Sequence, residues 1–332
     1  MSHRQRIYSF NATLFKMTGV QKVLLDIHHA IRDDYEAYVV GTIPFERIHK
    51  NLSISQSEYR RLRNPFMFYH SIVIVHERKY LLMFWLLNLL LLQRIKIVYI
   101  HHNIFHNLRR LTIMPKTVVS ISDRCTENLT GYFKVPLSHI HKIHNCVADL
   151  HPPVHKEPTP GQLTLLYPAR INEVKRQPEI VQKLKGRLDS HIKIFFAGDG
   201  PLLEQLIEVT AGSNQFIAMG YVSDIPSLMQ KCDYTLLFSK HEGLPITLIE
   251  SAMCGMPIVC NDVGGNTEIA IEGRNAIVVD DWEDLVTTLN SLAEINNERY
   301  LGMSAESRLI YEEHYTFEKF KEAYLQLLKD LN

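Results

Sequence analysis

Two acidic residues stand at a spacing that could bind the hydroxyl groups of a ligand. Glu242 and Glu250 are eight positions apart in residues 241–269, which read HEGLPITLIESAMCGMPIVCNDVGGNTEI. A strand is predicted to end just before, and Pro245 stands where the first turn of a helix would begin, a place that favours proline. Carboxylates there can accept hydrogen bonds from a ribose and a sugar, and a helix N-terminus favours a diphosphate. A solvated or helix-capping pair of acids has the same spacing, so the spacing alone leaves both interpretations open.

The stretch around these acids resembles the E-x7-E signature of glycosyltransferase family 4, a large family of retaining enzymes with the two-domain GT-B fold. The resemblance implies that Glu242 holds the transferred sugar and that Gly243, Leu244 and Glu250 belong to the nucleotide-binding site. It spans nearly the whole chain and is densest from residue 163 to 280. Several of the family's motifs occur together and in the same order, which makes the resemblance specific.

A pair of cations extends the resemblance. Arg170 and Lys175 follow a predicted strand in YPARINEVKRQ, with the five-residue offset of the arginine and lysine with which the family grips the donor diphosphate. Two fixed cations there would neutralise the developing charge of the leaving group without a metal. Taken alone, such residues are more often surface charges. Their position directly after a core strand favours the site.

Two glycine turns provide further candidates for ligand binding. Gly198 and Gly200 in FFAGDGP resemble the glycine turn of the family and let a backbone approach a ligand closely. Gly264 and Gly265 in VGGNTEI precede a predicted helix and offer backbone donors suited to phosphate or ribose. In the family the equivalent loop borders the nucleotide, which adds Thr267. A plain strand-to-helix turn is the alternative for this second loop.

Near the N-terminus, MTGVQKVLLDIHHAI resembles the glycine loop and helix that follow the first strand of the family. The family often has two glycines and then a basic residue, whereas this chain has Thr18 in place of one glycine. Gly19 is then the only flexible position and the candidate neighbour of the donor phosphate. Lys22 is the candidate charge partner.

Two histidines end another predicted strand. His101 and His102 occur in VYIHHNIFH, where the family often has a histidine that reaches the donor sugar. Side chains alternate along a strand, so only one of the two can face a ligand if the other points inward. We choose His102 as the catalytic candidate. A structural, hydrogen-bonded histidine is the alternative interpretation.

The elements that must position these residues follow from the alternation of strand-like and helical patterns. Continuous apolar runs begin at residues 37, 71, 96 and 117, and again at 163, 192, 234, 257 and 276. Such alternation is typical of parallel βαβ units, and strands without alternating polarity are buried on both faces. The sequence predicts an α/β protein of the GT-B type, with two Rossmann-like doubly wound domains that face each other across a cleft.

A proline-rich segment separates the two sets of strands. Four prolines occur within residues 151–160, where no helix can persist. We therefore predict an acceptor-side domain over residues 1–153, a linker over 154–161 and a nucleotide-sugar-binding domain over 162–315. A final helix, residues 316–330, has an apolar face that could pack back on the first domain.

Composition narrows the classes of partner and compartment. Lys plus Arg and Asp plus Glu both number 36, so no net field steers the protein toward nucleic acid. Five scattered cysteines without a CxxC pair do not form a disulfide framework and fit a reducing cytosol. The N-terminus leads into a short strand-like IYSF, and we predict no signal peptide.

Residues 80–92 read YLLMFWLLNLLLL, an apolar run that raises the question of a membrane segment. The run is short for a membrane span, which needs about 20 apolar residues. A buried helix is the preferred interpretation. Contact with a membrane surface and a true span are the alternatives.

The sequence also bears on several other possible functions. His102 and His106 have a spacing that would put both on one side of a helix, but no HExxH or paired CxxC completes a zinc site. The sequence contains no Asp-x-Asp and no G-x-G-x-x-G after its first strand, which disfavours a metal-dependent transferase and a nicotinamide dehydrogenase. A sugar-nucleotide epimerase or phosphorylase of the same architecture stays open, as does a non-catalytic subunit that binds a glycan or a partner.

Together these features predict a cytoplasmic, metal-independent retaining glycosyltransferase with no cofactor. Its partners would be a nucleotide-sugar donor, with a UDP-sugar as the first choice, and a glycan or lipid-linked glycan acceptor. Polysaccharide, capsule or lipopolysaccharide biosynthesis at the inner face of the membrane would suit it. Donor sugar, acceptor and linkage are set by a few pocket contacts that vary within one fold.

Overall fold

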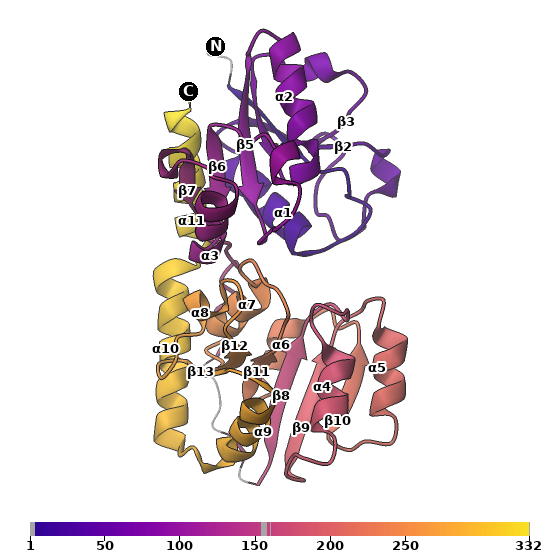
Figure 1. Ribbon diagram of the computed structural model, residues 1–332, viewed down its shortest axis with the longest axis vertical. Coiled ribbons are helices and arrows are strands. Elements are labelled where there is room, and N and C mark those ends of the chain that lie inside the picture. The colour runs from indigo at the N-terminus through magenta and orange to yellow at the C-terminus, as the bar shows by residue number, and fades with distance from the viewer. Residues whose placement is uncertain (1–3, 154–157, 160, 332) are drawn as a thin grey trace. The chain divides into compact units, whose positions relative to one another are not determined.

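The computed structural model describes residues 4–153, 158–159 and 161–331 (Figure 1). The chain forms two compact units. The first comprises the described residues up to Cys146 together with those from Phe317 onward, and the second runs from Val147 to Thr316. The first unit is therefore built from an N-terminal and a C-terminal segment of the chain.

Within the described residues, the first unit contains a seven-stranded sheet in the order β3-β2-β1-β4-β5-β6-β7, and every pairing is parallel. All five residues of the central strand β4 are buried, as expected for a sheet with helices on both faces. The strands are β1 Arg6–Phe10, β2 Glu36–Gly41, β3 Tyr59–Arg61, β4 Ser71–Val75, β5 Ile95–His101, β6 Thr117–Ser120 and β7 Ile140–Lys142. The helices are α1 Gly19–Ile31, α2 Leu81–Leu90, α3 Asp123–Glu127 and α11 Phe317–Asp330.

The second unit contains a six-stranded sheet among its described residues, in the order β10-β9-β8-β11-β12-β13, again wholly parallel. The strands are β8 Leu163–Pro168, β9 Ile192–Ala197, β10 Phe216–Gly220, β11 Tyr234–Leu237, β12 Ile258–Asn261 and β13 Ala276–Val279. The helices are α4 Gln177–Leu184, α5 Leu203–Thr210, α6 Ile225–Met229, α7 Ile246–Met253, α8 Asn266–Ile269, α9 Trp282–Ser291 and α10 Asn297–His314. The prediction of two Rossmann-like parallel-sheet domains is confirmed.

Strand order reverses once in each sheet. The first strand of each unit, β1 or β8, has the second strand on one side and the fourth, β4 or β11, on the other. Loops that leave these two neighbours run to opposite sides, which opens a crevice at the carboxyl ends of the strands. We therefore expect ligands to bind at the loops after β1 and β4 in the first unit and after β8 and β11 in the second.

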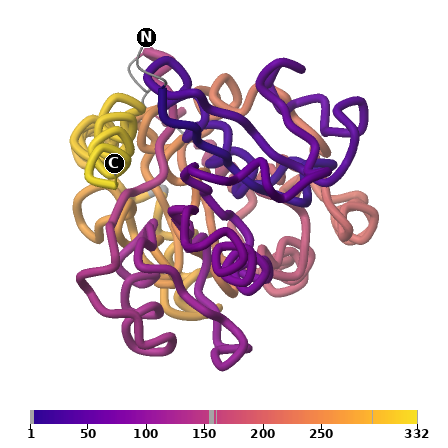
Figure 2. Tube along the Cα trace, turned by 90° about the horizontal axis from the view of Figure 1, so that it is seen from above, coloured from indigo at the N-terminus to yellow at the C-terminus, as the bar shows by residue number. Residues whose placement is uncertain are grey.

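The C-terminal helix α11 packs against α1 of the first unit and is the yellow coil marked C in Figure 2. Its buried residues are Phe320, Tyr324, Leu327 and Leu328. They recur at three- and four-residue spacing, which is the apolar stripe that a helix needs to cover a core. The chain therefore crosses back to complete the first unit.

The change from one unit to the other falls after Cys146, a few residues before the predicted domain boundary. The amide of Val147 donates to the carbonyl of Tyr315 at 3.2 Å, and its own carbonyl accepts from the Tyr311 hydroxyl at 2.9 Å. Asp149 accepts from both terminal guanidinium nitrogens of Arg308. Backbone bonding therefore assigns this segment to the second unit. Residues 154–157 and 160 of the predicted linker lie outside the described residues.

Helix α2 forms as predicted, but the prediction that it is buried is wrong. All of its residues are described, and only Leu81 and Phe84 are buried. Six of its apolar side chains are between 37% and 79% exposed: Leu82, Met83, Trp85, Leu86, Leu89 and Leu90. Leu81 and Phe84 pack in the core of the first unit, and the apolar side chains on the other faces of the helix are exposed within the described residues. No helix in the described part of the chain is both long and apolar enough to cross a membrane.

The packing of α11 gives a testable expectation. Tyr324→Ala removes a fully buried ring and is expected to lower the free energy of unfolding of the first unit by about 3–5 kcal/mol. Hydrogen exchange followed by mass spectrometry should show faster exchange in strands β1 to β6 and little change in β8 to β13. Glu322→Ala, on the exposed side of the same helix, is the control. Equal exchange in the two variants would show that α11 does not stabilise the first unit.

Candidate functional site

The central strands of the second unit bring two loops together. Strands β8 and β11 are parallel neighbours, with Leu165 paired to Tyr234. The loops that follow them, residues 169–176 and 238–245, therefore leave the sheet from adjacent positions at its carboxyl edge. These loops carry Arg170, Lys175 and Glu242 of the sequence prediction.

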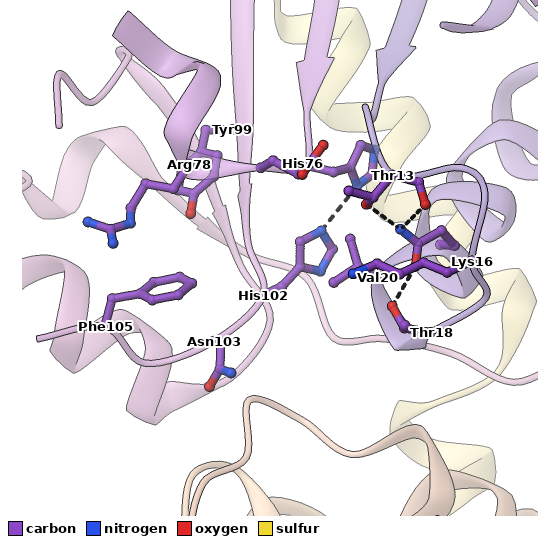
Figure 3. A pocket seen from close by; sticks show the side chains of 12 residues that line it. Thr13, Lys16, Thr18, Val20, His76, Arg78, Tyr99, His102, Asn103 and Phe105 are labelled. Atoms are coloured by element: carbon purple, nitrogen blue, oxygen red, sulfur yellow. Dashed lines mark hydrogen bonds between the residues drawn. The ribbon is translucent and has the colours of Figure 1, made fainter. Parts of the chain in front are cut away.

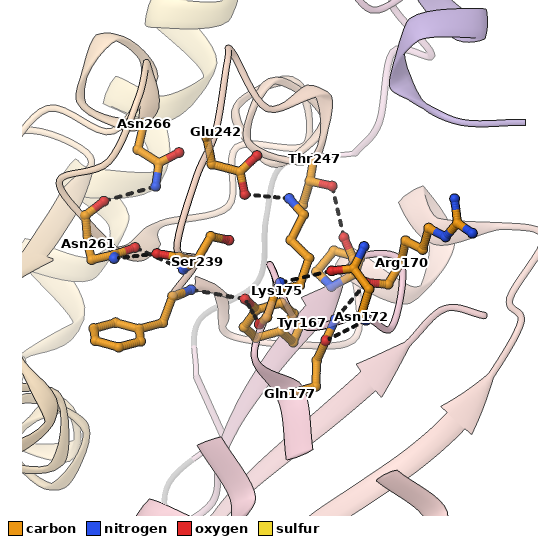
Figure 4. A network of polar contacts seen from close by, with 12 residues as sticks. Tyr167, Arg170, Asn172, Lys175, Gln177, Ser239, Glu242, Thr247, Asn261 and Asn266 are labelled. Carbon is orange, nitrogen blue, oxygen red and sulfur yellow. Dashed lines mark hydrogen bonds and ion pairs between the residues drawn. The ribbon is translucent and has the colours of Figure 1, made fainter. Parts of the chain in front are cut away.

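Lys175 and Glu242 form a partly buried ion pair in which Nζ lies 2.5 Å from Oε1 (Figure 4). Their side chains are 16% and 9% exposed. The backbone fixes the lysine: its amide donates to the Asn172 side chain at 3.0 Å, and its carbonyl accepts from the Tyr167 hydroxyl at 2.7 Å. A carboxylate held this way by one oxygen keeps the other as an acceptor for a ligand hydroxyl.

Arg170 belongs to the same loop but not to the ion pair. It is exposed, its carbonyl accepts from the Gln177 side chain at 3.1 Å, and its guanidinium extends away from Lys175 and Glu242 (Figure 4). Among the described residues, no acid pairs with this guanidinium. The structure thus brings two of these three charged residues into contact and leaves the third as an exposed cation in the same loop as Lys175.

Gly198 and Gly200 hold the Arg170 loop in place. A Cβ at Gly198 would lie 2.0 Å from the carbonyl oxygen of Ala169, and one at Gly200 would lie 2.1 Å from that of Ile171. No side chain fits at such distances. The close approach that these glycines allow is therefore to the backbone on both sides of Arg170.

The turn at Gly264 and Gly265 packs on the loop that carries the acid. Gly264 has φ of +57°, and a Cβ there would lie 2.0 Å from the carbonyl oxygen of Glu242. The amide of Gly265 donates to the carbonyl of Gly243 at 2.9 Å, and Leu244 is buried beside it. These residues therefore fix where the Glu242 carboxylate lies.

The remaining candidates of the second unit lie on two helices. Pro245 caps α7, and Thr247 in its first turn donates to the last carbonyl of β8 at 2.8 Å. Glu250 is half-buried in the second turn of the same helix. Thr267 lies on α8, a single turn, and its hydroxyl donates to the Asp262 carboxylate at 3.0 Å. Glu250 therefore follows the loop of Glu242 by one helical turn, and Thr267 follows the turn at Gly264 and Gly265.

The first unit has a cavity of about 260 Å³ at its own reversal of strand order (Figure 3). The lining side chains come from the loops after β1, β4 and β5, from the first turn of α1 and from β5 itself. They are Thr13, Lys16, Thr18, Val20, Gln21, His76, Glu77, Arg78, Tyr99, His102, Asn103 and Phe105. Polar and cationic groups therefore converge here, as a ligand rich in hydroxyls or phosphate requires.

His102 lines this cavity and His101 does not. The His101 side chain is fully buried, with Nε2 3.0 Å from Oδ1 of Asn128. His102 is half-buried, and its Nε2 lies 3.1 Å from Nδ1 of His76. Burial lowers the pKa of His102 to about 3 and that of His101 to about 4, so both imidazoles are neutral at neutral pH. The strand alternation used in the sequence argument selects the histidine that lies in the cavity wall.

The N-terminal loop differs from the expectation in which cation it offers. Gly19 is the exposed first residue of α1, with Thr18 as its N-cap. Lys22 pairs with Asp26 one turn along the helix, Nζ to Oδ1 at 2.5 Å. Lys16 is the lysine that lines the cavity. The basic residue is therefore supplied before the glycine and not after it.

Three cavity residues that directly follow β4 were not among the residues predicted from the sequence. They are His76, Glu77 and Arg78, in SIVIVHER. Glu77 accepts from the amide of Ala12 at 2.6 Å, and the Arg78 guanidinium lies 4.5 Å from the ring centre of Phe105. The signal was available, because residues directly after a central parallel strand are where ligands bind.

The histidine spacing that suggested zinc does not form a helical pair. Residues 102 and 106 belong to an irregular segment after β5, and His106 is exposed. In the described part of the chain, no group of three or more histidine, cysteine or acidic residues is placed to hold a metal ion.

Comparison with known proteins supports the class of protein that this geometry suggests. Residues 154–309 match the family model of glycosyl transferases group 1. The putative glycosyltransferase EpsD of Bacillus subtilis is 30% identical over 121 residues, which cover 35% of this chain and 32% of that protein. The UDP-Gal:alpha-D-GlcNAc-diphosphoundecaprenol alpha-1,3-galactosyltransferase of Escherichia coli is 22% identical over 114 residues, 33% of this chain and 29% of that enzyme. The match thus spans about a third of the length of these relatives.

Solved structures match over almost the full length. Anabaena Alr3699/HepE in complex with UDP has a TM-score of 0.82 at 16% identity, over 98% of this chain and 100% of that one. The pneumococcal O-GlcNAc transferase GtfA, in complex with UDP and GlcNAc, has a TM-score of 0.78 at 12% identity, over 99% of both chains. The chain therefore has the GT-B fold, and the comparisons support a glycosyltransferase enzyme.

The packing of Gly264 against the acid can be tested by substitution. Gly264→Ala is expected to lower the free energy of unfolding by more than about 2 kcal/mol. A non-glycine residue in the left-handed region costs about 1–2 kcal/mol, and the new Cβ would also collide with the Glu242 carbonyl. Urea unfolding measures the loss. Gly212→Ala is the matched control, since Gly212 has φ of +71° and open space around it. Equal losses in the two variants would contradict the close packing.

Proposed function

We propose that this chain is a retaining glycosyltransferase that moves a sugar from a UDP-sugar to a glycan or lipid-linked glycan acceptor in the biosynthesis of a polysaccharide. The observation that carries the proposal is the partly buried Lys175–Glu242 ion pair where the strand order of the second unit reverses. It lies inside the stretch that matches the family model. A carboxylate and cations at the carboxyl ends of parallel strands suit a sugar and a diphosphate.

UDP is the proposed nucleotide of the donor. Two structures with the same fold, HepE and GtfA, are complexes with UDP. In this chain the exposed guanidinium of Arg170 is free to turn onto a diphosphate, and Lys175 supplies a second cation in the same loop. The other proposed nucleotide contacts are Gly198, Gly200, Gly243, Leu244, Glu250, Gly264, Gly265 and Thr267, with Gly19 from the first unit.

Catalysis is proposed to need no metal. Negative charge develops on the diphosphate as it leaves, and fixed cations can stabilise that charge in place of a divalent ion. Arg170 and Lys175 have this role. Glu242, held by Lys175, is proposed to bind a hydroxyl of the transferred sugar, and His102 offers a neutral imidazole for a sugar hydroxyl in the cavity of the first unit.

The acceptor is proposed to be presented at a membrane surface, the inner one if the protein is cytoplasmic as we expect. One relative is named for a diphosphoundecaprenol-linked acceptor. The exposed apolar face of α2 is followed by the exposed Arg94 and preceded by Lys79, which pairs with Glu77 at 3.2 Å. Apolar side chains beside cations suit the headgroup region of an anionic bilayer, which would cover the leucines and attract the charges.

Binding of the donor nucleotide tests the central proposal. UDP with EDTA present is expected to raise the melting temperature, because a ligand at about 100 times its Kd stabilises the native state by about 2.7 kcal/mol. Arg170→Ala should abolish the shift without changing the melting temperature of the free protein, since this guanidinium has no ion-pair partner among the described residues. Lys175→Ala is less suitable, because it leaves Glu242 buried and unpaired.

Lys231→Ala serves as the control, because Lys231 is an exposed cation of the same unit outside both loops. A shift with GDP or ADP in place of UDP would contradict the UDP proposal and keep the transferase. No shift with any nucleoside diphosphate would favour the non-catalytic alternative. Hydrolysis or transfer assays with radiolabelled UDP-sugars then identify the sugar.

Co-sedimentation with vesicles tests the membrane proposal. The protein is expected to bind vesicles with about 30% phosphatidylserine, and Leu86→Ser with Leu90→Ser should weaken binding by about tenfold or more, because each leucine contributes buried apolar area. Leu309→Ser is the control, since Leu309 is 42% exposed on α10 of the second unit. Full activity on water-soluble acceptors without any vesicle binding would overturn this part of the proposal.

A further inference from the structure

A second histidine stands behind His102. His76 follows β4 and His102 follows the adjacent parallel strand β5, so the two side chains meet at the carboxyl edge of the sheet (Figure 3). His76 Nδ1 lies 3.1 Å from His102 Nε2. The rings are stacked, with centroids 5.3 Å apart and planes 20° apart.

A hydrogen bond between two imidazoles requires that one ring donates and the other accepts. Burial lowers the pKa of His76 well below its usual value and that of His102 to about 3. Each ring is therefore neutral and carries one proton. Only one of the two facing nitrogens can hold a proton, so two arrangements exist.

The surroundings of His76 decide between them. His76 is 4% exposed, and its Nε2 is inaccessible and has no hydrogen-bond partner among the described residues. A proton on that nitrogen would be a buried N–H without an acceptor, and such orphaned donors are rare because they lose the full hydration of the group. The proton of His76 therefore belongs on Nδ1, facing His102.

We propose that His76 is a positioning residue that donates its Nδ1–H to Nε2 of His102 and thereby fixes the His102 proton on Nδ1. His102 Nδ1 has no partner in the described part of the chain, and His102 lines the cavity. The cavity therefore receives a hydrogen-bond donor of fixed orientation. His76 lines the cavity but cannot hydrogen-bond a ligand through Nε2, because that nitrogen is inaccessible.

This arrangement determines what His102 can recognise. A fixed N–H binds an oxygen that offers a lone pair, such as a sugar hydroxyl or a carbonyl, and repels an ammonium group. The identity of the bound group rests on the proposed function, whereas the position of the proton does not. The two statements can therefore fail separately.

Nitrogen-15 NMR of histidine-labelled full-length protein measures the proton positions directly. Long-range proton–nitrogen spectra at pH 7 are expected to show His102 protonated on Nδ1 and His76 protonated on Nδ1, with His102→Asn used to assign the signal. His76→Asn should keep this state of His102, because its amide can still donate from nearly the same position. His76→Leu should give a mixture of tautomers. A His102 proton on Nε2 in the unaltered protein would overturn the proposal.

Kinetics distinguish positioning from a purely structural role. In His76→Leu, kcat is expected to fall about tenfold with the donor KM changed by less than about threefold, and His76→Asn should recover most of the loss. His141→Leu, at an exposed histidine of the same unit, is the control. The positioning role would be wrong if kcat fell equally in the Asn and Leu variants and in proportion to the decrease of their melting temperatures. If no transfer is found with any donor, the proposed function fails while the tautomer result still decides this inference.

Discussion

The candidate site of the second unit depends on a partly buried charge pair. Lys175 and Glu242 lose part of their hydration when they pair, and removal of one partner would leave the other charge without compensation. The pair therefore persists only where other groups hold it, and here these are the Tyr167 hydroxyl, the Asn172 side chain and the turn at Gly264. Three loops from β8, β11 and β12 must agree in position, which makes this edge of the sheet rigid before any ligand binds.

Both units place their polar groups at the same feature of the fold, yet with different chemistry. In the second unit the strand reversal carries an ion pair and an exposed arginine, a set that suits charged phosphate and sugar hydroxyls. In the first unit it carries two imidazoles that burial keeps neutral, in a cavity that Lys16, Glu77 and Arg78 also line. Neutral and charged hydrogen-bonding groups therefore lie together in this cavity.

Most of the fold could be predicted, and the strands that were missed share one property. All nine apolar runs named in the sequence became parallel strands, because a strand covered on both faces must be apolar throughout. The missed strands, β3, β7 and β10, each lie at an edge of a sheet. An edge strand pairs on one side only and can be short and polar, as YRR and IHK are, so its sequence has no periodic signal. Helix α2 failed differently: its sequence is apolar all round and does not say which stripe is covered.

The sequence by itself determined which residues follow the central strands, and its resemblance to a known family then named Arg170, Lys175, Glu242 and His102 as candidates. The tertiary structure decided which of them meet. Lys175 and Glu242 are 67 positions apart, and His76 and His102 are 26 apart. Contact between such distant positions depends on which strands become neighbours and on how each loop leaves the sheet. That information lies in the pairing of whole elements, and local periodicity does not contain it.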